Sequence, residues 1–66
     1  MSHGLLANGR SGDFYVEVEE EIATQKHTLL IEHPSLRDNQ IQIPLTAATK
    51  DIDDLIAALK QVRDEL

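Results

Sequence analysis

Glutamates gathered in one short segment are the residues of this sequence that come closest to forming a chemical site. Glu17, Glu19 and Glu21 alternate with other residues, so in a β-strand they would project from one face about 6.6 Å apart. Such a row of carboxylates could bind a protein rich in lysine and arginine, or imitate the spaced phosphates of a nucleic acid. A solvated outer face that protects the sheet from edge-to-edge aggregation is the alternative.

Two apolar residues are expected among these carboxylates. Tyr15 has the same parity as the glutamates, and Leu30 and Glu32 share one face of the next predicted strand. An aromatic and an aliphatic side chain with a charged rim are typical of a small contact patch, although scattered exposed apolar residues are also normal. The candidate interaction surface is therefore the outer face of the predicted sheet, with Tyr15, Glu17, Glu19, Glu21, Leu30 and Glu32.

Catalytic and metal-binding patterns are missing from the sequence. It has no cysteine, which removes a thiol nucleophile and a thiolate zinc site, and it has no nucleophile-elbow or phosphate-binding glycine motif. His27 and His33 would lie about 20 Å apart along one strand, too far to share a metal ion. The aspartates at positions 51, 53 and 54 suit the start of a helix. We therefore predict a protein that is not an enzyme and needs no metal or cofactor.

Length and charge limit the function further. Sixty-six residues form one domain that buries only about 60% of its unfolded surface, so its core is marginal. Without disulfides, association is the remaining way to stabilise it, and we predict a homodimer or an obligate partner. The net charge of −6 disfavours phosphate backbones and anionic membranes. Without a membrane-spanning run or a signal-peptide pattern, we expect a cytoplasmic protein.

The order of elements follows from the hydrophobic pattern. Residues 1–13 hold all three glycines and are predicted to be a flexible tail. Period-two alternation predicts strands over 14–22, 27–33 and 40–45, and Pro44 indicates an edge strand or a strand end.

A C-terminal helix is the clearest element of the pattern. Its apolar residues form a stripe about 120° wide, made of Ile52, Leu55, Ile56, Leu59, Val62 and Leu66. Thr46 and Thr49 are both suitable N-caps. The predicted fold is α+β: a small two-layer β-β-β-α domain over 14–66, with a three-stranded antiparallel sheet packed on the helix.

Three functional hypotheses follow. The first is a dimeric protein-interaction module, a regulator, inhibitor or accessory subunit that binds a basic protein through the outer sheet face. Second, a small sheet followed by a helix is similar in element order to dimeric coactivator domains of the PC4 type. That resemblance implies single-stranded nucleic-acid binding, for which Lys26, Arg37 and Arg10 would supply the positive charge. Third, the helix stripe itself could dock on a larger partner.

Overall fold

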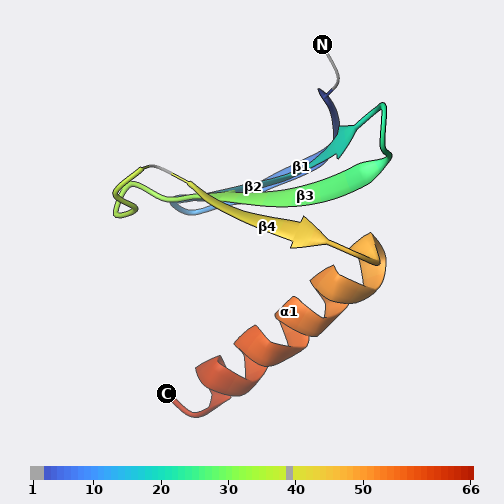
Figure 1. Cartoon of the computed structure of the whole chain (residues 1–66). Coiled ribbons are helices and arrows are strands. Elements are labelled where there is room, and N and C mark those ends of the chain that lie inside the picture. Colours follow the sequence, from blue (N-terminus) through green and yellow to red (C-terminus); the bar gives the residue numbers. More distant parts are fainter. Residues whose placement is uncertain (1–2, 39) are drawn as a thin grey trace.

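The chain forms one antiparallel sheet followed by one helix (Figure 1). The computed structural model describes residues 3–38 and 40–66. The sheet is a meander in the order β1-β2-β3-β4. The elements are β1 (His3–Ser11), β2 (Phe14–Glu21), β3 (Lys26–Glu32), β4 (Ile41–Leu45) and α1 (Ala48–Asp64). The α+β class is confirmed, and the three predicted strands agree with β2, β3 and β4 to within one residue at each end.

Strand β1 corrects the expected three-stranded sheet to four strands. It forms from the segment predicted to be a flexible tail, of which Met1 and Ser2 lie outside the described residues. Ser11 pairs with Phe14, so only Gly12 and Asp13 connect β1 to β2. Gly12 has a φ of 58°, which glycine adopts without steric cost and a two-residue hairpin connection requires. The expected boundary at residue 13 therefore falls inside a hairpin.

The cross-strand register sorts the side chains of the sheet onto two faces. Glu17 lies opposite Leu30, and Val18 lies opposite Leu29, which in turn lies opposite Ile43. Because side chains alternate along each strand, one side, here called the acidic face, carries Tyr15, Glu17, Glu19, Glu21, Leu30 and Glu32. The other side, here called the apolar face, carries Phe14, Val16, Val18, Leu29, Ile31, Ile41, Ile43 and Leu45.

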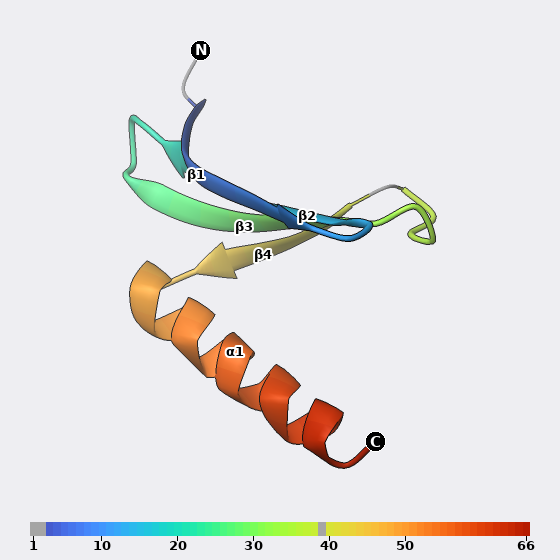
Figure 2. The same ribbon diagram turned by 180° about the vertical axis from the view of Figure 1, so that it is seen from behind.

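Helix α1 does not cover the sheet. It turns back after β4 and diverges from the strands (Figures 1 and 2). Among the described residues, only Leu29 and Leu30 are buried, each 6% exposed, and α1 contributes none. The prediction that the sheet packs on the helix is therefore wrong. Periodicity identifies the apolar side of a helix, but it carries no information about which surface covers that side.

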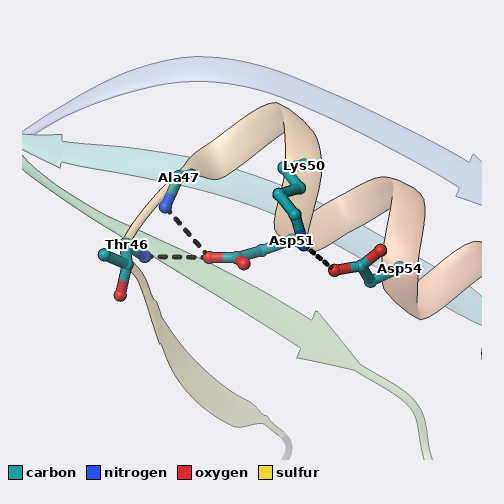
Figure 3. A network of polar contacts seen from close by, with 5 residues as sticks. All are labelled: Thr46, Ala47, Lys50, Asp51 and Asp54. Carbon is teal, nitrogen blue, oxygen red and sulfur yellow. Dashed lines mark hydrogen bonds and ion pairs between the residues drawn. The ribbon is translucent and has the colours of Figure 1, made fainter.

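The start of α1 is fixed by a backward-reaching carboxylate. The N-cap is Ala47, whose side chain cannot cap the helix. Asp51 Oδ2 instead accepts hydrogen bonds from the backbone N–H groups of Thr46, at 2.9 Å, and of Ala47, at 3.1 Å (Figure 3). The carboxylate thus satisfies two backbone donors immediately before the helix, and its charge suits the positive end of the helix dipole.

Candidate functional site

The acidic face lies across the middle of the sheet. Three of its glutamates come from β2, which is hydrogen-bonded to β1 on one side and to β3 on the other. Leu30 and Glu32 come from β3, opposite Glu17 and Tyr15. The register therefore brings together all six residues of the predicted interaction surface, and the two flanking strands hold the backbone of the glutamate row in place.

Glu17 and Glu19 form the least compensated part of this face. The neighbours of Glu17 across the strands are Asn8 and Leu30, and those of Glu19 are Leu5 and Thr28, so all four are uncharged. Within the described part of the chain, neither carboxylate makes a side-chain hydrogen bond or an ion pair.

The end of the row differs from its middle. Glu21 lies opposite Lys26, and its Oε1 atom accepts a hydrogen bond of 2.5 Å from Thr24 Oγ1. On β2, the negative charge that remains available to a partner is therefore centred on Glu17 and Glu19; Glu32 on β3 adds a further carboxylate with an uncharged neighbour, Tyr15.

Tyr15 is held in place by two residues of β1. Arg10 Cζ lies 5.0 Å from the centroid of the Tyr15 ring, within the range of a cation–π contact. Asn8 Nδ2 lies 3.3 Å from the phenol oxygen, to which it donates a hydrogen bond. Neither contact was predicted from the sequence, because both residues lie in the segment expected to be a flexible tail. The ring also borders an open depression lined by Arg10, Asp13, Tyr15, Glu32, His33 and Pro34.

Leu30 contributes to the acidic face in a different way from Tyr15. It is only 6% exposed and lies between Glu17 on β2 and Gln42 on β4. Its side chain is therefore packed among its neighbours in the sheet and exposes little area to a partner. Its position on β3, with a strand on each side, was the available signal for this burial.

His27 and His33, which were predicted to lie too far apart to share a metal ion, contact different residues. His27 Nε2 lies 3.5 Å from Glu20 Oε2, while the His33 ring lies 4.4 Å from that of Phe14, between centroids. Across residues 3–38 and 40–66, no three histidine, aspartate or glutamate side chains gather as a metal site would require.

Asp51 and Asp54, near the start of α1, also make different contacts. Asp51 bonds to the backbone before the helix, whereas Asp54 Oδ2 lies 2.7 Å from Lys50 Nζ (Figure 3).

The basic residues considered for nucleic-acid binding do not form one cluster. Arg10 pairs with Tyr15 near one end of the sheet, and Lys26 pairs with Glu21 at the other end. Arg37 lies in the connection between β3 and β4, at the same end as Arg10. In the described residues, α1 is too short and too polar to cross a membrane.

Comparison with protein-family models, with curated proteins and with solved structures found no match.

Proposed function

We propose that this protein is a small non-enzymatic interaction module that binds a basic protein partner through the acidic face of its sheet. In that role it would act as a regulator, an inhibitor or an accessory subunit. The observation that supports the proposal is the pair Glu17 and Glu19, which share one face of a central strand and have no partner for their charge in the described residues.

The geometry of the pair favours a cationic ligand. Two carboxylates on alternate residues stand about 6.6 Å apart, and at that distance their repulsion in water is about 0.6 kcal/mol before screening by salt. A lysine or arginine side chain placed between them would remove the repulsion and gain two charge-assisted contacts. Because β1 and β3 hold the backbone of the row in place, little backbone conformational entropy would be lost on binding.

Tyr15 supplies the apolar part of the proposed contact. Aromatic residues in a charged surrounding often contribute most of the binding energy, and Arg10 and Asn8 restrict the motion of this ring. The glutamates would steer the partner and fix its position. Binding should therefore weaken as the salt concentration rises, because exposed charges are screened.

A charge-neutralising double variant tests the proposal against a matched control. Glu17→Gln with Glu19→Gln removes two charges from the acidic face, while Asp53→Asn with Glu65→Gln removes two exposed charges from α1. Each tagged chain is incubated with extract of its source cells at low and high salt, and captured proteins are quantified. We expect a basic protein that the wild type and the control retain at low salt and that the face variant loses about tenfold, corresponding to 1.4 kcal/mol.

Two results would contradict the proposal. The first is equal capture by the folded face variant and the control, which would show that the glutamate row does not contact the partner. The second is binding of a single-stranded oligonucleotide with an affinity that falls steeply as salt rises. That result would favour the nucleic-acid-binding alternative.

A further inference from the structure

The chain exposes more surface than a folded monomer of its size. A monomeric protein of 7.4 kDa has an accessible surface of about 4,200 Å², whereas this chain exposes 5366 Å². Its radius of gyration is 13.0 Å, compared with about 11 Å for a compact domain of this length. The chain therefore exposes roughly 1,100 Å² more surface than a compact monomer of the same mass would.

The excess surface is concentrated on the apolar face and on the helix stripe. Six of the ten exposed large apolar side chains in the described residues belong to these two surfaces. From the face they are Phe14, Val16 and Ile41, and from the stripe Ile56, Leu59 and Val62; Leu66, which the pattern had assigned to the stripe, lies beyond the end of α1. An apolar area of this extent on a small protein marks an interaction surface.

The sheet and α1 diverge from their junction after β4 and leave an open wedge between them. The apolar residues at the start of α1, Ile52 and Leu55, are half-buried, while those further along the helix are exposed. Exposure on the sheet follows the same gradient, since Leu45 next to the helix is half-buried and Phe14 at the far end is 54% exposed. Figure 2 shows that α1 begins beside the end of β4 and separates from the sheet along its length, so the half-buried residues at its start lie where helix and sheet are nearest.

We propose that a second copy of this chain fills the wedge. The helix of each copy lies against the apolar face of the other, so that the interface is the same on both sides of a two-fold axis. In one chain, no helix covers the apolar face of the sheet, and no sheet covers the apolar stripe of the helix. If each of two copies places its helix on the sheet of the other, both surfaces are covered. The excess surface of roughly 1,100 Å² is sufficient for this, because a stable interface uses about 800 Å² of each partner.

Charge supports this arrangement over other pairings of two copies. Each copy carries a net charge of −6, and contact between two acidic faces would bring like charges together. Pairing through the apolar faces keeps the glutamate rows on opposite outer sides, where both stay accessible. The polar residues Glu20 and His27 on the apolar face already contact each other within one chain, with His27 Nε2 3.5 Å from Glu20 Oε2. The proposal is independent of the proposed function, since it involves the opposite face of the sheet.

The mass of the protein in solution tests the dimer directly. Sedimentation equilibrium of the wild-type chain should give twice 7.4 kDa at micromolar concentration. Leu59→Lys places a charge in the proposed interface, and Gln61→Lys places the same side chain on the opposite side of the helix as a control. We expect the first variant to raise the dissociation constant at least about hundredfold, because the substitution occurs in both copies and places a charge against an apolar surface each time, and the second to leave it unchanged.

A second measurement identifies the surfaces even if Leu59→Lys fails to fold. In a mixture of isotope-labelled and unlabelled wild-type chains, nuclear Overhauser effects that arise only between chains should connect Val62 with Val16 or Phe14. Three results would overturn the proposal: a monomeric mass at all concentrations, a dimer whose inter-chain contacts lie on the acidic face, or a monomer in which α1 closes on its own sheet.

Discussion

Leu29 and Leu30 are neighbours on β3 with the same exposed fraction, 6%, yet they belong to opposite faces of the sheet. Leu30 is surrounded by polar neighbours, Glu17 and Gln42, and Leu29 by the apolar residues Val18 and Ile43. The acidic face is compatible with water as it stands, because polar side chains flank Leu30, its only buried residue in the described part of the chain. On the apolar face, Leu29 is the only residue among those described that is buried; four others are half-buried, and Phe14, Val16 and Ile41 are exposed.

This difference assigns the two requirements of a small domain, partner binding and stability, to different faces of the sheet. One face can present charge to a partner with little effect on the stability of the chain, since no large apolar area depends on it. The other face carries the apolar area from which folding gains its free energy, and in a single chain part of that gain is not realised, because Phe14, Val16 and Ile41 stay exposed. A second copy would supply it, in agreement with the small size of the chain.

The largest expected effect is a difference between two alanine substitutions on β3. Leu29→Ala should lower the free energy of unfolding by about 4 kcal/mol and Leu30→Ala by about 2 kcal/mol, because the cost of a cavity grows with the packing around it. In the proposed dimer, the second copy would add that packing on the side of Leu29 alone. Urea unfolding at one protein concentration measures both values. Equal losses would show that the two faces are equally covered in solution.

A smaller effect is expected at the connection between the apolar face and the helix. Asp51→Ala removes the acceptor for the N–H groups of Thr46 and Ala47 and should destabilise the protein by about 1 kcal/mol, as the loss of a helix cap does. Thermal unfolding followed by circular dichroism measures the change. Asp53→Ala is the control, because no hydrogen bond of its side chain is seen in the described residues, and it should change stability by less than half as much.

The smallest effect is expected on the acidic face. Glu17→Gln with Glu19→Gln should stabilise the fold by about 0.5 kcal/mol at low salt, since it removes the repulsion between neighbouring carboxylates. The gain should disappear at high salt, where such repulsion is screened. Urea unfolding at two salt concentrations checks both statements. A loss of stability at low salt would mean that these carboxylates have a structural partner.

The sequence predicted the strands with alternating side chains, the helix and the composition of the acidic face. These features depend on local periodicity, as in Phe14, Val16 and Val18, and periodicity is visible in the residues themselves. Strand β1 was missed because its pairing depends on the backbone, and its glycines resemble those of a flexible segment. Gly12 followed by Asp13 was the available signal, since this pair is typical of a two-residue hairpin connection.

The position of α1 could not be obtained in the same way. The stripe from Ile52 to Leu66 shows which side of the helix avoids water, but a surface on another chain satisfies that requirement as well as one on the same chain. The hydrophobic pattern could not predict the contacts of Asn8 and Arg10 with Tyr15 either. These contacts require β1 to lie beside β2.

The two edges of the sheet are unequal. Strand β1 has nine residues, whereas β4 has five, and Pro44 in β4 has no N–H group with which to continue a ladder. Growth of the sheet from one molecule to the next would need β1 of one chain to pair with β4 of another, and repetition of that contact would produce a fibre. The short, proline-containing edge of β4 opposes such polymerisation.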